Sequence, residues 1–282
     1  MEAGIFYVVA TPIGHLDDIT GRAVQVLGQV DLILAEDTRH SLPMLRRFGV
    51  QTPLQALHEH NEYRRLPKII ARLQAGENIA LISDAGTPLI SDPGYLLVRA
   101  LRERHLAVVP IPGPSALTCA LSAAGVPTDR FVFESFLPPK QSQRLRRLRA
   151  LACEPRTLVF FEAPHRLLAT LEDMAAVFGE DRQGVLAREI TKTFETFRQG
   201  TLSDLHAWLQ ANPEQRKGEF VILIEGTAEI EAPGVIVRGA DVLLALLPLL
   251  PVKQAVTIAA RLSGEKRNML YRQAMDFMKR PL

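Results

Sequence analysis

The first half of the chain alternates short, continuous apolar runs with segments of helical periodicity. The apolar runs predict five buried strands, at 5–10, 31–35, 54–57, 79–82 and 106–111. The periodic segments predict helices at 21–27 (with Thr20 as N-cap), from 39 to about 48, and at 62–74, 94–104 and 115–124. Buried strands that alternate with helices indicate a parallel sheet covered on both faces.

The same alternation continues after residue 125 and then gives way to helices alone. Strands are predicted at 131–134, 157–161, 183–187 and 219–224, and helices at 141–152, from 166 to 177, and at 202–209. Helices at 240–247, 253–262 and 266–278 follow a linker-like stretch at 229–239. We therefore expect an α/β domain at 1–124, a second α/β domain at 125–227, and a linker with a basic helical tail at 228–282.

Polar residues cluster where the first five strands meet their helices. These junctions lie at 11–20, 36–39, 58–61, 83–94 and 112–115, and parallel strands bring them to one edge of the sheet, where open α/β proteins bind ligands. The 83–94 junction has the richest chemistry, with two Ser-Asp pairs around Gly86-Thr87-Pro88. Its glycine permits close backbone approach, and its carboxylates and hydroxyls suit a polar ligand. An ordinary loop with helix-capping residues is the alternative.

Composition narrows the class of protein further. With 47% hydrophobic and 23% charged residues, the 282-residue chain has the composition of an ordinary globular protein. Cys119 and Cys153 lie beside apolar residues outside any Cys-x-x-Cys pair, so reduced thiols and a cytoplasmic location are expected. No signal peptide or membrane-length apolar run is expected. Dinucleotide, P-loop and zinc motifs do not occur. His58 and His60, predicted to share a strand face, lack a third ligand, so no metal site is expected.

Positive charge is concentrated in two segments, the predicted helix near 141–152 and the tail at 253–280. The helical segment has no acidic residue and carries Lys140, Arg144, Arg146, Arg147 and Arg149. Clustered Lys and Arg neutralise phosphates and supply most non-specific affinity for nucleic acid. RNA is therefore a candidate partner, although a solvated helix face is the commoner origin of a charge run.

Seven short motifs, met in order along residues 5–225, resemble one family. They are Thr11-Pro12-Ile13-Gly14, Ala35-Glu36-Asp37-Thr38-Arg39, Ser83-Asp84-Ala85-Gly86-Thr87-Pro88, Ser91-Asp92-Pro93-Gly94, Pro112-Gly113-Pro114-Ser115-Ala116, Glu162-Ala163-Pro164-His165-Arg166 and Arg188-Glu189-Ile190-Thr191-Lys192. Together they are similar to the bacterial 16S rRNA (cytidine-2′-O)-methyltransferases, a branch of the tetrapyrrole-methylase-like enzymes that use S-adenosylmethionine. The tail at 253–274 is similar as well. The chain departs from the family at His15 (usually Asn), Ser135 (usually Gly) and Ala163 (commonly Ser).

The resemblance implies a tetrapyrrole-methylase-like fold with the cofactor in a cleft between two α/β domains. The expected cofactor contacts are Ser83, Asp84, Ala85, Gly86 and Thr87, then Pro112, Gly113 and Ser115, then Pro12 and Gly14. The candidate catalytic residues are Lys192, Glu189, His165 and Glu162. A lysine base would need its pKa lowered by burial or by neighbouring cations. Arg39 and Arg166 are candidates to grip RNA phosphates. Each of these charged residues has a structural ion pair as its alternative role.

The activity that the resemblance implies is S-adenosylmethionine-dependent 2′-O-methylation of a cytidine ribose in 16S rRNA of the small ribosomal subunit. Related enzymes imply a homodimer. Two other functions stay open from the sequence. One is a methylase of a tetrapyrrole-like small molecule, which would have little use for the arginine-rich helix. The other is a non-catalytic RNA-binding assembly factor that has kept the fold.

Overall fold

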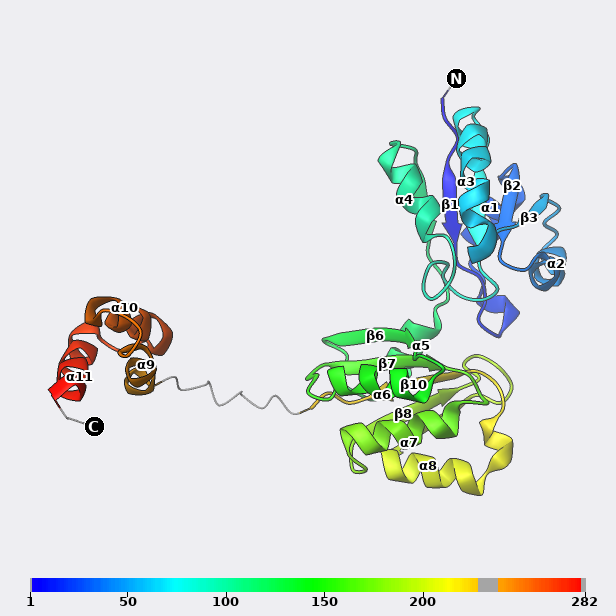
Figure 1. The fold of residues 1–282 in the computed structure, drawn as a ribbon. Coiled ribbons are helices and arrows are strands. Elements are labelled where there is room, and N and C mark those ends of the chain that lie inside the picture. The colour runs from blue at the N-terminus through cyan, green and yellow to red at the C-terminus, as the bar shows by residue number, and fades with distance from the viewer. Residues whose placement is uncertain (1, 228–237, 280–282) are drawn as a thin grey trace. The chain divides into compact units, whose positions relative to one another are not determined.

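The structure is a computed structural model that describes residues 2–227 and 238–279. The chain forms two compact units, Met1–Thr227 and Ala228–Leu282 (Figure 1). The larger unit holds two separate five-stranded sheets. Of the predicted linker at 229–239, all but the last two residues lie outside the described part of the chain.

The first sheet is entirely parallel, with strand order β3-β2-β4-β1-β5. The strands span β1 (Phe6–Val9), β2 (Leu32–Ala35), β3 (Leu54–Ala56), β4 (Ile79–Ile82) and β5 (Val108–Ile111). Every residue of β2 and β4 is buried, as expected for central strands covered on both faces. The predicted parallel sheet is confirmed, and its strand-to-helix junctions share one edge.

Two pairs of helices cover the two faces of this sheet (Figure 1). One face packs against α1 (Gly21–Gln29) and α2 (Thr38–Arg47), and the other against α3 (Glu59–Gln74) and α4 (Tyr95–Glu103). Thr20 caps α1, as predicted, because its Oγ1 accepts a hydrogen bond from Ala23 N at 3.1 Å. A short 3₁₀ helix, η1 (Leu16–Asp18), precedes it.

Helix α3 begins three residues earlier than the sequence pattern predicts. His58 is its N-cap residue, and the Asn61 side-chain oxygen accepts a hydrogen bond from His58 N at 3.0 Å. Strand β3 ends at Ala56, so His60 lies in the helix. The prediction that His58 and His60 share a strand face is therefore wrong, although their ring centroids lie 6.0 Å apart.

The second sheet is mixed, with strand order β6-β7-β10-β8-β9. Its strands span β6 (Phe131–Phe136), β7 (Thr157–Glu162), β8 (Gln183–Arg188), β9 (Thr196–Thr201) and β10 (Phe220–Ile224). β10 runs antiparallel to both β7 and β8. β9 was not predicted. It is an edge strand with no buried residue, so its sequence lacks the apolar alternation that reveals a core strand.

Helices cover the second sheet on both faces, and one of them precedes the predicted domain boundary at residue 125. α6 (Gln141–Ala150), α7 (Leu167–Phe178) and α8 (Leu202–Ala211) pack on one face, with η2 (Pro213–Arg216) after α8. The other face packs against α5 (Ala116–Ala123). We predicted this helix as part of the domain at 1–124, but Ala120 and Leu121 join the core of the second sheet. Ile13, from the loop after β1, joins the same core, so the two halves share apolar contacts.

The smaller unit consists of α9 (Gly239–Leu246), α10 (Val252–Ser263) and α11 (Arg267–Lys279) among its described residues. Its core contains buried residues from all three helices, which are Leu243, Ala255, Val256, Ala259, Leu270 and Ala274. Among the helices that the structure describes, none combines the length and apolarity that a bilayer crossing requires.

Candidate functional site

A pocket of about 500 Å³ opens between the junction edge of the first sheet and the second sheet. This volume is typical of small-molecule sites. The junctions after β1, β2, β4 and β5 all contribute to its wall, together with β6, β7, β10 and the loop after β8. The lining residues are Ile13, Glu36, Asp84, Ala85, Gly86, Thr87, Ile90, Ser91, Asp92, Ser115, Ala116, Phe136, Phe161, Glu162, Ala163, Pro164, Ile190, Glu219, Phe220 and Val221.

The 83–94 loop is fixed to its neighbours by backbone and side-chain hydrogen bonds. Thr11 and Gly86 exchange both backbone bonds, at 2.8 and 3.0 Å, and Thr87 Oγ1 donates to the Pro114 carbonyl at 3.0 Å. Gly86 has φ +79°, and a Cβ there would lie 3.3 Å from the Ile13 side chain. A larger residue at Gly86 would be strained, so the sequence provides a close, shaped wall at this point.

The pocket wall is rich in carboxylates, and one of them, Asp92, is partly buried. Burial raises the pKa of Asp92 to about 6, against a lowering effect of its hydrogen bond with Ser83 and a further raising effect of the Asp84 charge. Asp84 Oδ1 accepts a hydrogen bond from Asp37 N at 3.0 Å, which fixes the Asp84 carboxylate. Glu36 lines the same wall. Negative charge held in a partly enclosed pocket favours a cationic ligand.

Half of the predicted cofactor residues line the pocket, and the other half lie in the same loops next to it. Asp84, Ala85, Gly86, Thr87 and Ser115 are lining residues. The remaining five are not among the lining residues, and they are Ser83, Pro112, Gly113, Pro12 and Gly14.

Two of these five residues, Ser83 and Gly113, have clear structural contacts. The Ser83 side chain is buried, and its Oγ donates to the Ala85 carbonyl at 3.1 Å. A Cβ on Gly113 would lie 2.9 Å from the Ala10 Cβ, so glycine permits the close packing of β5 and β1 there. The contacts of Ser83 and Gly113 show how these residues support the pocket, and direct contact of all five residues with the cofactor stays a prediction.

Glu162 lines the pocket, but its carboxylate is already occupied by internal partners. Its two oxygens accept hydrogen bonds from Ala163 N at 2.8 Å and from Thr170 Oγ1 at 2.6 Å, and the Arg166 guanidinium lies 3.1 Å away. Arg166 also donates to the Leu137 carbonyl. These contacts form the structural ion pair that the sequence left open as the alternative role of both residues. His165 is exposed and is not a lining residue.

Lys192 lies in a cluster of carboxylates beside the pocket. Its Nζ donates to Glu189 Oε1 at 3.1 Å and to Glu219 Oε2 at 2.8 Å, and Glu219 lines the pocket. Burial lowers the pKa of Lys192, but the hydrogen bonds and charges of Glu219 and Glu189 outweigh it and hold the pKa above its ordinary value. These contacts favour the charged form of Lys192 over the neutral form that a general base requires.

Glu189 is equally committed to this cluster. Burial raises the pKa of Glu189, but hydrogen bonds from Glu219 N and Lys192 outweigh it, so that the pKa lies below its ordinary value. Glu189 and Thr191 have φ of +50° and +64°, an uncommon backbone conformation for residues other than glycine. Strain of this kind often accompanies functional loops, and here it presents Lys192 beside the pocket.

Gly14 explains how the two halves meet at this cluster. A Cβ on Gly14 would lie 2.5 Å from Lys192 Cγ and 2.7 Å from Thr191 Oγ1. His15 N donates to Thr191 Oγ1 at 3.0 Å. The contact uses the backbone of His15, so it does not depend on the side chain that departs from the family pattern.

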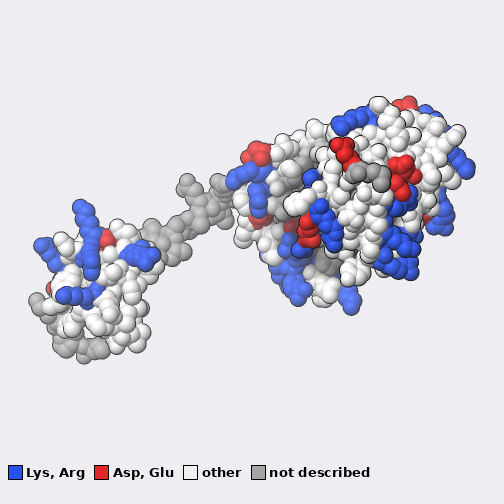
Figure 2. Space-filling model, turned by 90° about the horizontal axis from the view of Figure 1, so that it is seen from above, with Lys and Arg blue, Asp and Glu red and all other residues white. Residues whose placement is uncertain are grey.

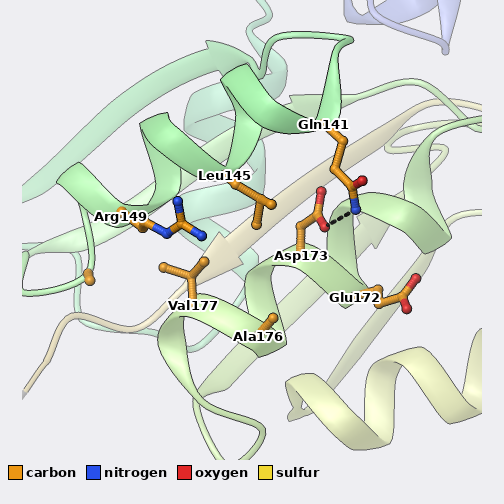
Figure 3. Close-up of a pocket in the computed structure, with 8 residues that line it drawn as sticks. Gln141, Leu145, Arg149, Glu172, Asp173, Ala176 and Val177 are labelled. Atoms are coloured by element: carbon orange, nitrogen blue, oxygen red, sulfur yellow. Dashed lines mark hydrogen bonds between the residues drawn. The ribbon is translucent and has the colours of Figure 1, made fainter.

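The basic helix α6 is less free than its sequence suggests. Arg144 is buried, with its Nε 2.7 Å from Asp173 Oδ2, so the prediction that Arg144 contacts RNA is wrong. Gln141 donates to the other Asp173 oxygen, at the edge of a groove between α6 and α7 (Figure 3). Arg147 is bonded to Glu134 through two nitrogens at 2.7 Å.

Three cations of the α6 segment remain exposed without a partner among the described residues, and they are Lys140, Arg146 and Arg149. Arg149 projects along the α6 side of the groove in Figure 3. Arg39, in contrast, is exposed but bonded to Asp37 at 2.7 Å. Its hydrogen bond is the main cause that holds the pKa of Asp37 at about 2. Free positive charge on α6 is thus smaller than predicted but still present.

Several pocket residues were not predicted. Asp92 and Glu36 belong to motifs recognised in the sequence, and both follow predicted strands. Their positions could therefore have indicated that they line the pocket. Glu219 was predicted only as the first residue of a strand, Phe136 as part of a loop and Phe161 as the last residue of a strand, so no motif singled them out. Among residues 2–227 and 238–279, no group of three or more His, Cys, Asp or Glu side chains is placed to hold a metal ion.

Comparison with known proteins assigns both units. Residues 6–206 match the family model of tetrapyrrole (corrin/porphyrin) methylases. Residues 237–277 match the model named RsmI C-terminal HTH domain. The chain is 54% identical to "Ribosomal RNA small subunit methyltransferase I" of Pseudomonas aeruginosa, over 98% of both chains. It is 52% identical to the protein of the same name from Escherichia coli O157:H7, over 97% of this chain and 95% of the other.

Solved structures agree on the fold. A uroporphyrin-III-C-methyltransferase from Thermus thermophilus is 21% identical, with a TM-score of 0.56 over 81% of this chain and 97% of the other. A diphthine synthase is 14% identical, with a TM-score of 0.59 over 79% of this chain and 89% of the other. At these identities the likeness concerns the fold alone, and it confirms a tetrapyrrole-methylase-like architecture.

Proposed function

The chain belongs to the ribosomal RNA small subunit methyltransferase I family within the tetrapyrrole methylases, and we propose that it transfers a methyl group from S-adenosylmethionine to the 2′-oxygen of a cytidine ribose in 16S rRNA. The observation that carries this proposal is the carboxylate-lined pocket at the junction edge of the first sheet. The pocket has the size and the charge for a cationic small molecule.

The pocket residues fit the chemistry of S-adenosylmethionine. Asp84, Asp92 and Glu36 place negative charge where a sulfonium and an amino group would bind. The backbone around Gly86 permits close approach, and Phe136 and Phe161 supply apolar surface on the opposite wall. When bound, S-adenosylmethionine supplies a methyl group that is attached to a positively charged sulfur. The rest of the cofactor would leave as a neutral thioether.

The protein's own part in the reaction is positioning and electrostatics. Held close together, two reactants react far faster than in free solution. We assign Lys192 the role of a cation that stabilises negative charge as it develops on the ribose 2′-oxygen, while the proton of that hydroxyl passes to bulk water. Glu189 and Glu219 hold its Nζ, and Gly14 lets this loop approach the first half closely. Lys140, Arg146 and Arg149 support contact with rRNA phosphates.

Asp92→Asn is expected to change how cofactor affinity depends on pH. Asp92 gains its negative charge as pH rises through about 6, so wild-type affinity for S-adenosylmethionine should rise over that range. The variant, which stays neutral, should bind more weakly at pH 7.5 and lose most of this rise. Calorimetric titration between pH 5 and 8 measures both effects.

The stability of the same variant provides a second check with a defined sign. Because the folded-state pKa of Asp92 exceeds its unfolded value, the native protein holds an extra proton between about pH 4 and 6, and this contribution to stability is lost as pH rises. In Asp92→Asn, the stability should no longer fall between about pH 4 and 6 for this reason. Asp17→Asn, at an exposed carboxylate outside the pocket, is the control. An unchanged affinity profile in Asp92→Asn would count against cofactor binding at this wall.

Methyl transfer to purified small ribosomal subunits tests the proposed function directly. With labelled S-adenosylmethionine, the subunits should acquire label in rRNA, whereas a porphyrinoid offered in their place should not. Label on the porphyrinoid alone would favour the small-molecule methylase. Tight binding to subunits without any transfer would favour the assembly factor. The homodimer and the cytoplasmic location stay predictions, which sedimentation and cell fractionation can test.

A further inference from the structure

The C-terminal unit has the layout of a helix-turn-helix. Three residues, Gly264 to Lys266, connect the end of α10 to the start of α11, and Gly264 has φ +72°. Two helices joined by a short turn that contains glycine commonly place the second helix against nucleic acid. The match of residues 237–277 to a model with this name is consistent with that layout.

One contact defines a continuous basic face across α10 and α11. Arg267, the first residue of α11, donates through Nη2 to Thr257 Oγ1 of α10 at 2.7 Å. Lys253 and Arg261 lie four residues before and after Thr257, on the same side of α10. Lys253, Thr257, Arg261 and Arg267 are all exposed. Three cations therefore surround a single point of contact between the two helices.

An aromatic side chain extends this face along α11. Tyr271 lies one helical turn after Arg267 and is 43% exposed. Exposed aromatic rings beside Lys and Arg are typical of surfaces that bind unpaired RNA, because bases stack on the ring while cations neutralise the phosphates.

Two of the three acidic residues described in this unit lie away from this face. Among its described residues these are Asp241, Glu265 and Asp276. Glu265 accepts a hydrogen bond from Gly239 N at 2.7 Å, which turns its carboxylate toward α9. Asp276 follows Arg267 by nine positions, about half a turn around the helix. Lys and Arg side chains are spread over the visible face of this unit with little Asp or Glu between them (Figure 2).

We propose that the face formed by Lys253, Thr257, Arg261, Arg267 and Tyr271, here called the α10–α11 face, docks the protein on the phosphate backbone of its rRNA substrate. The proposal rests on the proposed function, which makes RNA the partner that complements this charge. The face contains none of the pocket residues. It should therefore contribute to substrate binding and leave the rate of the bound complex unchanged.

The test uses the full-length protein with Lys253, Arg261 and Arg267 all replaced by Ala. The KM for small subunits should rise about tenfold or more, with kcat within about twofold, because the lost contacts are to phosphates. The slope of log affinity against log salt concentration, for binding to 16S rRNA, should become shallower by about 2 to 3. Affinity for S-adenosylmethionine should not change, and a thermal melt checks folding.

Single variants on α11 provide a matched control. Arg272 is exposed but lies about 140° around the helix from Arg267, so Arg272→Ala should have little effect where Arg267→Ala weakens binding. Equal effects of the two, or an unchanged KM and salt slope in the triple variant, would overturn the proposal. The proposal would also be overturned if the triple variant lost affinity for whole subunits but kept its full affinity for free 16S rRNA. That result would identify a ribosomal protein as the partner. If wild type methylates no subunits, the proposed function fails instead, and rRNA binding still tests the face.

Discussion

Replacing Lys192 with Met is expected to lower kcat by about 10²- to 10³-fold, the usual cost of removing one group that stabilises developing charge. The affinity for S-adenosylmethionine should change little, because Lys192 is not a residue that lines the pocket. Glu189 keeps its hydrogen bond from Glu219 N in the variant, so the loop retains part of its support. Single-turnover methyl transfer at saturating cofactor and subunit measures the effect.

Lys192→Arg distinguishes a cation from a base at this position. Arginine keeps the positive charge but does not lose its proton in proteins. If Lys192 acts as a cation, the kcat of the Arg variant should be much higher than the kcat of the Met variant. If the Arg variant is as inactive as the Met variant while its melting temperature and cofactor affinity are normal, the assignment of Lys192 as a cation is wrong.

Replacing Arg144 with Met is expected to lower the free energy of unfolding by about 3–5 kcal/mol, because the Asp173 carboxylate would stay buried without its partner. The two side chains are only 5% exposed, and their closest atoms lie 2.7 Å apart. A shift of the urea unfolding midpoint measures the loss. The double variant Arg144→Met with Asp173→Leu should recover most of it, since both charges are then removed.

Arg146→Met, two residues away on α6, is the matched control. Arg146 is exposed and has no partner among the described residues, so its loss should change stability by less than about 0.5 kcal/mol. It should instead weaken binding to rRNA. If Arg144→Met were as stable as Arg146→Met and selectively lost RNA affinity, the original prediction for Arg144 would be restored and the structural role rejected.

The parallel sheet could be predicted because its strands are buried on both faces. Such strands read as continuous apolar runs, and their junctions must share an edge, which placed Asp84 to Thr87 and Ser115 at the pocket. Edge strand β9 carries no such signal, because exposed positions accept any polar residue. The helix α5 shows a related limit: its Ala and Leu residues predict a helix but not the sheet on which it packs.

Charge was harder to interpret than periodicity, because a partner can come from a distant element. The α6 segment contains no acid, yet Asp173 of α7 and Glu134 of β6 engage Arg144 and Arg147. A lysine base at Lys192 would need burial or neighbouring cations, but its Nζ contacts the carboxylate of Glu219, 27 positions later in the chain. All three pairs depend on tertiary packing, which local sequence patterns do not encode.

Mapping of ribose methylation in 16S rRNA tests the central claim most directly. Cells that lack this protein, cells that carry the wild type and cells that carry Asp84→Ala should be compared for 2′-O-methylated cytidine. The account predicts that a 2′-O-methylated cytidine appears with the wild type and is absent in the other two. It is contradicted if the ribose methylation pattern of 16S rRNA is the same in all three, or if the methyl group gained with the wild type lies on a base.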